Sequence, residues 1–157
     1  DAAPRPHGDN NRDAVCRSID TLREAAAAAR VKLALELIPN RLSTAAALVR
    51  LLDDLDLRDA GVCLDFGHAF LGGDLVDAIE TVSGALLTTH VHDNRGVTDD
   101  HLVPFEGRID WNQALFACQK VGYDGVWTLE VANTSTPAAV LARAREACGR
   151  FRDILAS

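Results

Sequence analysis

Residues 61–70 read GVCLDFGHAF, and this stretch holds in one place the pattern that the rest of the chain repeats. A short run of β-forming residues at 61–66 is followed by a glycine and a histidine, and then by a segment of helical composition at 75–83. Asp65 lies at the carboxyl end of the run, and His68 comes shortly after it. We therefore predict a strand, then a loop that bears polar groups, then a helix.

The same order recurs on both sides of this stretch along the chain. The predicted strands cover residues 31–37, 61–66, 86–92 and 126–131, and the predicted helices cover residues 13–30, 44–55, 75–83, 111–121 and 137–155. Strands that alternate with helices of this length indicate βαβ units and a parallel sheet. No linker, fixed-period repeat or low-complexity block divides residues 1–157, so we expect a single domain of the α/β class.

Each predicted strand has two unlike faces, because successive side chains of a strand point to opposite sides. One face is bulky and apolar, as with Leu33, Leu35 and Leu37, and suits packing beneath helices. The other face is small or mixed and ends in a polar group, as with Ala34 and Glu36. A parallel sheet with helices outside and an enclosed inner face forms the wall of a (β/α)8 TIM barrel, whose active site lies at the carboxyl ends of the strands.

The chain is too short for a complete barrel. A (β/α)8 barrel needs about 250 residues, whereas this chain has 157 and accounts for four β/α units. It contains no methionine, so we expect it to be a piece of a longer protein or a processed product. Either an N-terminal half absent from this chain or a second copy, in a homo-oligomer, is then expected to complete the ring.

Composition narrows the class of function. The chain is 48% hydrophobic and 25% charged, which is typical of a globular domain with a core. No apolar run approaches the roughly 20 residues that cross a bilayer, and the polar start at 1–12 has no signal-peptide core, so we expect a cytoplasmic protein without a membrane partner. A net charge of −7 is unlike the basic surface of nucleic-acid binders and favours a small neutral ligand.

The four cysteines, Cys16, Cys63, Cys118 and Cys148, are widely spaced and include no CxxC pair. Neither a disulfide framework nor a thiolate zinc site is therefore indicated. Because free cysteine usually packs as a small hydrophobic residue, we expect all four to be buried thiols.

Four consecutive predicted strands each deliver one ionisable side chain at the carboxyl end. These residues are Glu36, Asp65, His90 and Glu130. Three carboxylates and one imidazole at one mouth suit a single divalent ion such as Mn²⁺, Mg²⁺, Co²⁺ or Zn²⁺. Any one of them alone is equally well explained as a solvated polar group that ends a strand, but that coincidence would have to recur on every strand. We therefore predict a metal site at this mouth.

Further polar residues flank these strand ends. His68 can reach the same mouth as a ligand or substrate contact, although a histidine after a glycine turn can also cap the next helix. His92 or the adjacent Asp93 is a candidate to orient a ligating imidazole. Asp99 and His101 form an Asp-x-His pair that fits either a second metal or substrate site or a plain surface loop.

The segments ELIP, CLDFGHAF, HVHDNRG, DDH…EGRIDW and GYDGVWTLEV follow one another along the chain. Their order resembles the xylose isomerase-like TIM-barrel superfamily, which joins sugar isomerases and epimerases with AP endonucleases of the endonuclease IV type. The resemblance runs from about residue 12 to residue 155 and corresponds to the C-terminal half of that family. It implies a (β/α)8 barrel of which this chain holds about the C-terminal four β/α units.

The resemblance also implies roles for the strand-end residues. In epimerase-like members one divalent ion is bound, and His68 would touch substrate oxygens. The ligands carried over from those members are Glu36, Asp65, His90 and Glu130. In the endonuclease branch a trinuclear zinc cluster also uses two histidines of the other half and the residues that match His68, Asp99 and His101. All ligand types of the C-terminal half are present, so both branches stay open on ligands alone.

The chain departs from the family pattern in two places. One departure favours sugar chemistry, and the other changes the loop at the mouth of the barrel. The first strand ends in ELIP and lacks the ENT-like sequence of the endonuclease branch. The turn before the IDW segment, often of a glycine-rich form in the family, here reads PFEG at residues 104–107, so we expect a loop of different shape. Trp111 is expected to be a packing residue at the start of a helix.

The leading hypothesis is a metal-dependent isomerase or epimerase of a small sugar or polyol. The metal would chelate a carbonyl and an adjacent hydroxyl and stabilise the enediolate that forms when the intervening C–H loses its proton. Glu36 and Glu130 are the candidate acid and base, and the residues expected to bind substrate are His68, His92, Asp99 and His101. The alternatives are a zinc-dependent AP endonuclease that hydrolyses DNA phosphodiesters, and a non-catalytic half-barrel that needs a partner.

Overall fold

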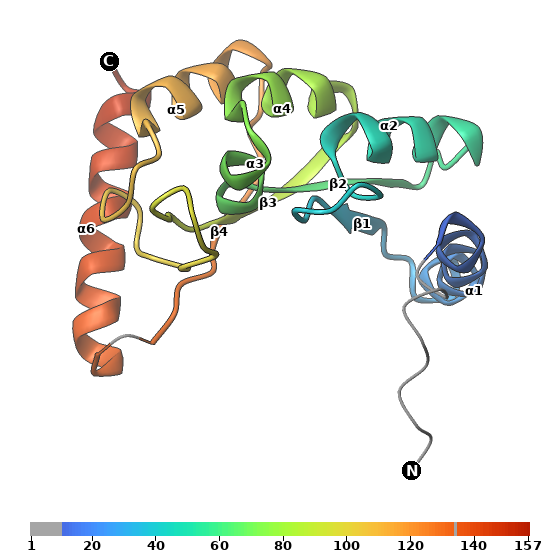
Figure 1. Ribbon diagram of the computed structural model, residues 1–157, viewed down its shortest axis with the longest axis horizontal. Coiled ribbons are helices and arrows are strands. Elements are labelled where there is room, and N and C mark those ends of the chain that lie inside the picture. The colour runs from blue at the N-terminus through green and yellow to red at the C-terminus, as the bar shows by residue number, and fades with distance from the viewer. Residues whose placement is uncertain (1–10, 134) are drawn as a thin grey trace.

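The computed structural model of the chain describes residues 11–133 and 135–157; of the polar start considered above, residues 1–10 lie outside that part. A four-stranded parallel sheet in the order β1-β2-β3-β4 forms its centre (Figure 1). The strands are β1 (Leu33–Glu36), β2 (Ala60–Asp65), β3 (Leu86–Val91) and β4 (Trp127–Leu129). The predicted α/β class with a parallel sheet is confirmed.

The helices are α1 (Arg12–Ala29), α2 (Ala45–Asp54), α3 (Phe66–Gly72), α4 (Leu75–Val82), the 3-10 turn η2 (Ser83–Ala85), α5 (Trp111–Lys120) and α6 (Pro137–Leu155). Helices α2, α4 and α5 follow one another along one side of the sheet, and α6 packs against α5 (Figure 1). All five predicted helices are present, with ends within one residue of the prediction. Within the described residues, no helix combines the length and the apolar character that a membrane span requires.

The two edge strands are shorter than predicted. Leu33–Glu36 replaces the predicted 31–37, and Trp127–Leu129 replaces 126–131. The first strand starts late because the Val31 N–H donates to the Ala26 carbonyl at the end of α1. The last strand has a neighbour on one side only, β3. Glu130 nevertheless stays in line with the sheet, since its N–H donates to the Val91 carbonyl at 3.1 Å.

Helix α3 is not predicted from the sequence. It begins at Phe66, so β2 ends at Asp65 and not at the expected residue 66. Asp65 caps this helix, because its carboxylate accepts a hydrogen bond from the His68 N–H at 2.7 Å. The helix ends before Gly73, which has a φ of 136° that only glycine adopts easily. The loop after β2 is therefore helical, and His68 is held on it directly beside the strand end.

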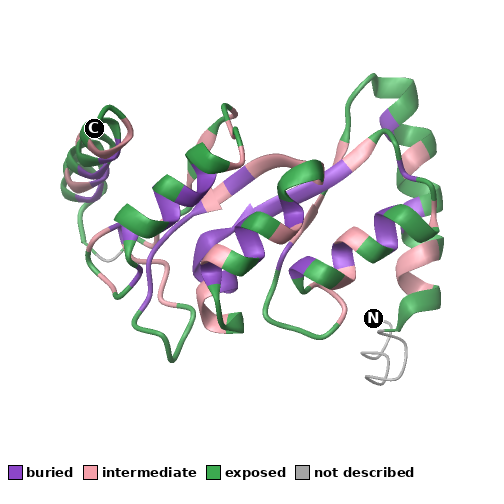
Figure 2. Ribbon diagram, turned by 90° about the horizontal axis from the view of Figure 1, so that it is seen from above, coloured by how far each residue is buried: buried purple, intermediate pink, exposed green. Residues whose placement is uncertain are grey.

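The core lies between the sheet and the helices on its outer face. Val62 and Leu64 of β2 are fully buried and pack into one cluster with Ile79 of α4 and Leu115 of α5. Figure 2 shows the buried stretches running along the sheet and along the inward sides of these helices. The predicted apolar face of the strands therefore packs beneath the helices, as expected.

The other face of the sheet is the predicted inner wall. Ala34 on β1 and Thr128 on β4, the two edge strands, are exposed, whereas Cys63 on the central β2 is buried. Burial and the negative charges of nearby carboxylates raise the pKa of the Cys63 thiol to about 12. Cys148 on α6 is exposed and Cys16 on α1 is only partly buried, so the expectation that all four cysteines are buried holds for Cys63 and Cys118 alone.

Candidate metal and substrate site

The carboxyl ends of the four strands bring four ionisable side chains together. Glu36 ends β1, Asp65 ends β2, His90 is the penultimate residue of β3, and Glu130 directly follows β4. Each of the four offers one ligand atom, and these atoms all lie within 4.8 Å of one another. The register explains this convergence, because Asp65 pairs with His90 across β2 and β3. We call this set the strand-end cluster.

His90 joins the two glutamates of the strand-end cluster. Its Nδ1 lies 2.9 Å from Glu36 Oε1 and 3.0 Å from Glu130 Oε2. An ionised carboxylate only accepts hydrogen bonds, so Nδ1 carries the proton in this arrangement. The side chains of Glu36 and Glu130 are 36% and 48% exposed, so both can meet a ligand that enters from the mouth.

Asp65 is the buried member of the strand-end cluster. Its side chain is fully buried, and while Oδ1 accepts the His68 N–H, Oδ2 has no hydrogen-bond partner. A buried carboxylate oxygen without a partner is costly. A divalent cation would satisfy it, and three carboxylates with one imidazole are a donor set that such ions accept. The residues present therefore fit a metal ion.

A second cluster adjoins the first and consists of His68, His92, Asp99 and His101, whose candidate ligand atoms also lie within 4.8 Å of one another. We call it the loop cluster. Asp99 Oδ2 lies 3.1 Å from His68 Nε2 and 3.2 Å from His101 Nε2. His92 Nε2 lies 3.0 Å from Asp65 Oδ1, which places the two clusters side by side.

Backbone carbonyls orient two rings of the loop cluster. His68 Nδ1 lies 3.1 Å from the Leu37 carbonyl, and His101 Nδ1 lies 2.9 Å from the Glu130 carbonyl. Since a carbonyl only accepts, both Nδ1 atoms carry protons, and both Nε2 atoms are aimed at Asp99. A metal ion or a substrate hydroxyl at this place would meet two presented imidazole nitrogens and one carboxylate.

The charges of the loop cluster support one another. Burial disfavours the charged form of Asp99, but the hydrogen bond from His68 and the nearby imidazoles outweigh it and lower the pKa of Asp99. Burial likewise disfavours protonated His101, but the Glu130 carbonyl and the Asp99 carboxylate raise the pKa of His101. Each of the two pKa shifts thus favours the charged form of its own residue, because opposite charges on Asp99 and His101 attract one another.

His92 lies flat in the fully buried part of the loop cluster. Its ring stacks on that of His101 with 3.9 Å between centroids and 14° between planes. Nδ1 has no hydrogen-bond partner, and the 3.0 Å contact of Nε2 with Asp65 Oδ1 lacks the geometry of a hydrogen bond. Gly67 makes this position possible, because a Cβ there would lie 2.0 Å from the His92 ring. In the sequence, Gly67 is marked only as the glycine of a turn that directly precedes His68.

The structure corrects the interpretation of Asp93 as a candidate to orient an imidazole. Its carboxylate accepts hydrogen bonds from the loop that follows β3 and from the Trp111 indole. Trp111 is buried at the start of α5, so its expected packing role is confirmed.

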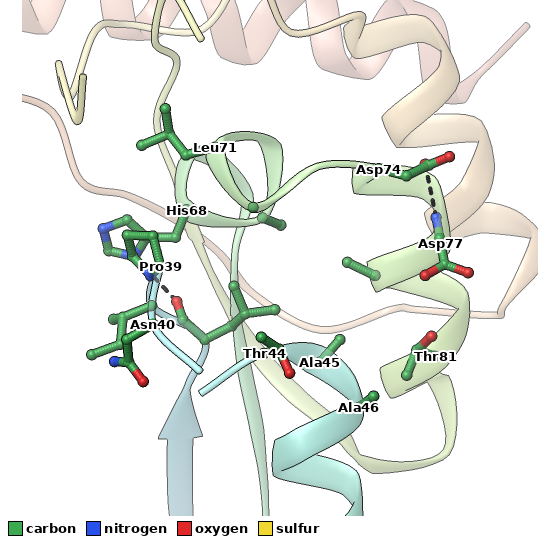
Figure 3. Close-up of a pocket in the computed structure, with 15 residues that line it drawn as sticks. Pro39, Asn40, Thr44, Ala45, Ala46, His68, Leu71, Asp74, Asp77 and Thr81 are labelled. Carbon is green, nitrogen blue, oxygen red and sulfur yellow. Dashed lines mark hydrogen bonds between the residues drawn. The ribbon is translucent and has the colours of Figure 1, made fainter. Parts of the chain in front are cut away.

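A pocket of about 410 Å³ opens beside the loop cluster (Figure 3). It lies between the β1–α2 loop, the start of α2, and helices α3 and α4, and its lining is mostly apolar. His68 is the one lining residue that also belongs to the two clusters.

A parallel β/α sheet with helices along one side and a polar cluster at the carboxyl ends of its strands has the features expected of a part of a TIM barrel. The chain belongs to the xylose isomerase-like TIM barrel family, whose model matches residues 2–154. The resemblance found in the sequence is thereby confirmed.

Two curated relatives are similar to parts of the chain. The Methanocaldococcus jannaschii protein MJ1311 is 32% identical over an alignment of 110 residues that covers 66% of this chain and 38% of that protein. The Sinorhizobium fredii protein y4fM is 41% identical over 64 residues, which are 40% of this chain and 21% of that protein. The chain thus spans well under half the length of the curated relatives it matches.

Solved sugar epimerases have the same fold. A D-tagatose 3-epimerase-like protein is 26% identical with a TM-score of 0.78, over 97% of this chain and 59% of that one. An L-ribulose 3-epimerase is 22% identical with a TM-score of 0.78, over 92% of this chain and 56% of that one. A D-psicose 3-epimerase from Clostridium cellulolyticum H10 is 21% identical with a TM-score of 0.78, over 99% and 60%. The described strands and helices thus form part of a TIM barrel.

Proposed function

We propose that the whole protein is a divalent-metal-dependent isomerase or epimerase of a small sugar or polyol. The observation that carries this proposal is the strand-end cluster, with one buried carboxylate oxygen of Asp65 left without a partner. The likeness to solved sugar epimerases supports the reaction class. The net charge of −7 suits a neutral substrate better than a polyanion.

The strand-end cluster would hold the metal ion through Glu36, Asp65, His90 and Glu130. When bound, the ion supplies Lewis acidity, which makes the C–H next to a substrate carbonyl easier to deprotonate. His90 gives up the Nδ1 proton that it shares with the glutamates if this nitrogen becomes a ligand.

The two glutamates are the proposed proton carriers. They come from the two edge strands of the sheet and meet at His90, so the substrate carbon can be approached from two sides. One glutamate, as the carboxylate, removes the proton from carbon. The other, as the carboxylic acid, delivers a proton to the opposite face for epimerisation, or to the neighbouring position for isomerisation. Partial exposure lets both exchange protons with solvent.

The loop cluster is the proposed site for the substrate hydroxyls. The Nε2 atoms of His68 and His101 and the carboxylate of Asp99 offer both donors and acceptors next to the strand-end cluster. A hydroxyl is both donor and acceptor, so it can replace the present contact between an imidazole and Asp99. His92 would form the buried floor beneath them.

The test is solvent-deuterium incorporation next to the carbonyl, with a panel of ketoses and polyol ketones and the whole protein. Glu36→Gln and Glu130→Gln keep size and one oxygen but remove the base. We expect each to retain measurable metal and to lose about a hundredfold or more in exchange rate. Glu80→Gln, at an exposed ion pair with Lys120, is the matched control and should exchange as the unaltered protein does. Exchange that persists undiminished in both site variants would remove the glutamates from this role.

The second candidate function is a zinc-dependent AP endonuclease, and the loop cluster favours it. A second set of four ligand atoms next to the first is the arrangement that a site with several zinc ions needs. Metal analysis of the whole protein separates the two functions. One ion per chain together with exchange on a ketose supports the isomerase. Several zinc ions per chain, no exchange, and cleavage of DNA at abasic sites would establish the endonuclease instead.

A further inference from the structure

The loop between β3 and α5, residues 92–110, carries three of the four residues of the loop cluster, namely His92, Asp99 and His101. It contains no helix, and long loops of this kind in compact domains usually serve function. Two of its residues other than glycine have positive φ, His101 at 48° and Phe105 at 75°. Such a backbone is held only where its surroundings fix it.

Asp93 is the group that fixes this loop. Its carboxylate is fully buried, and its two oxygens accept from four N–H groups, at 2.8 Å to 3.1 Å. The donors are the N–H groups of Asn94, Phe105 and Ile109 and the indole Nε1 of Trp111. One buried carboxylate thus connects both ends of the loop and the start of α5. Hydrogen bonds to a charged acceptor are about twice as strong as neutral ones.

The backbone of Asp93 reaches the loop cluster directly. Its N–H donates to the Leu102 carbonyl and its carbonyl accepts from the Leu102 N–H, both at 2.8 Å. Leu102 is the residue next to His101, whose own carbonyl accepts from the Ala132 N–H at 2.8 Å. Gly107 closes over the carboxylate, since a Cβ there would lie 2.2 Å from Asp93 Oδ1. These contacts together fix the course of the loop backbone around Asp93.

We propose that Asp93 is the positioning residue of this site: its buried carboxylate sets the path of the 92–110 loop and thereby places His101 on the ring of His92 and Asp99 against His68. The role in binding substrate rests on the proposed function, whereas the placement of the rings does not. Asp93 touches none of the reacting groups and acts through the loop. An asparagine there would put an amide N–H₂ where a carboxylate oxygen now accepts two N–H groups.

The test replaces Asp93 in the whole protein, after chelator treatment, and follows the histidine rings by NMR. In Asp93→Asn the indole N–H signal of Trp111 should move, which shows that its hydrogen bond is altered. The ring signals of His92 and His101 should shift, and the nuclear Overhauser effect between the two rings should disappear, because the rings stacked at 3.9 Å move apart. Ile79→Val, in the core away from the loop, is the control for lost stability and should leave both rings in place.

The outcomes separate this proposal from the proposed function. Unmoved ring signals in Asp93→Asn, with the indole signal moved, would overturn the positioning role. If that variant does not fold, Trp111→Phe removes one donor and keeps the carboxylate, and it should shift the same rings by less; no shift would again overturn the role. Metal bound to the strand-end cluster should stay at the level of the unaltered protein in Asp93→Asn, while the KM for substrate rises about tenfold. If the rings separate in Asp93→Asn but the unaltered protein shows no catalytic activity, the positioning role of Asp93 stands and the isomerase proposal is refuted.

Discussion

Asp65 acts through two different oxygens. Oδ1 caps helix α3 by accepting the His68 N–H at 2.7 Å, and Oδ2 is buried without a partner in the strand-end cluster. The first contact belongs to folding, and the second oxygen belongs to the proposed metal site. A single substitution can therefore separate the two.

Asp65→Asn should keep the cap and lose the metal. Asparagine caps helices about as well as aspartate, and the neutral amide removes a buried charge, so the free energy of unfolding of the metal-free protein should fall by no more than about 0.5 kcal/mol. Metal affinity should drop by at least about 10- to 100-fold, the loss seen when even an outer partner of a metal ligand is removed. Isothermal titration with Mn²⁺ or Co²⁺ measures this. Asp74→Asn alters the cap of α4 instead and should bind metal normally; equal affinities for both variants would contradict the assignment.

Gly67 matters because the His92 ring lies against it. In Gly67→Ala the new Cβ would stand 2.0 Å from that ring, so the ring or α3 must move. Overpacking of this kind costs about 1–3 kcal/mol, which urea unfolding would measure. Gly149→Ala in α6 is the control, since its Cβ meets open space, and it should stabilise by about 0.5–1 kcal/mol. Equal stabilities of the two variants would show that His92 does not lie where the structure has it.

Among the elements, the sequence predicts best the strands and helices whose apolar residues recur at a regular spacing. Val62, Leu64 and their neighbours alternate with smaller residues, so the strands and their buried face could be recognised. The convergence of the strand-end cluster could also be foreseen, because parallel strands end at one edge of a sheet. Helix α3 could not, since it is only seven residues long and begins on a carboxylate that also ends a strand.

The path of the 92–110 loop lies beyond sequence patterns for a different reason. It depends on hydrogen bonds that the Asp93 carboxylate accepts from the Phe105 N–H, the Ile109 N–H and the Trp111 indole, and these donors follow Asp93 at no fixed spacing. The neighbouring position of Asp93 and His92 suggested an imidazole partner, whereas the chain turns the carboxylate toward the loop. Asp99 and His101 could be named as candidates, but their place against His68 and His92 follows only from that path.

Helix α6 is joined to this loop by aromatic packing. Phe151 is buried, with its ring centroid 5.0 Å from that of Trp111 and 5.5 Å from that of Phe105. Phe151→Ala should therefore lower the free energy of unfolding by about 3–5 kcal/mol. Phe116→Ala on α5 is the control, because that side chain is 67% exposed and its loss should change stability by less than about 0.5 kcal/mol. Thermal unfolding compares them, and similar midpoints would contradict the packing of α6.

On the scale of the whole molecule, the sheet has two edges, β1 and β4. These strands also carry exposed residues on the predicted inner wall, Ala34 and Thr128. Unpaired strand edges and an uncovered wall promote pairing with another chain or segment. Either further strands of the whole protein or a second copy would cover them.

The 157-residue chain by itself should therefore associate. Sedimentation velocity at increasing concentration should show dimers or larger species, because edge strands offer unpaired N–H and C=O groups. The whole protein, with a complete ring, should show no such growth driven by these edges. A monodisperse, monomeric and cooperatively unfolding chain of 157 residues would remove most of the support for the half-barrel interpretation.

The strand order of the sheet equals the order of the strands in the chain. During synthesis on a ribosome, each new β/α unit therefore leaves the exit tunnel when its partner strand is already present. β2 can join β1 before β3 exists, and β4 is the last to dock on a surface that is otherwise formed. Chains grow more slowly than such neighbouring units find each other. The strand-end cluster is thus completed when Glu130 arrives beside three groups already in place. A nascent chain that stalls before β4 would carry three of the four groups and should hold the proposed metal ion more weakly.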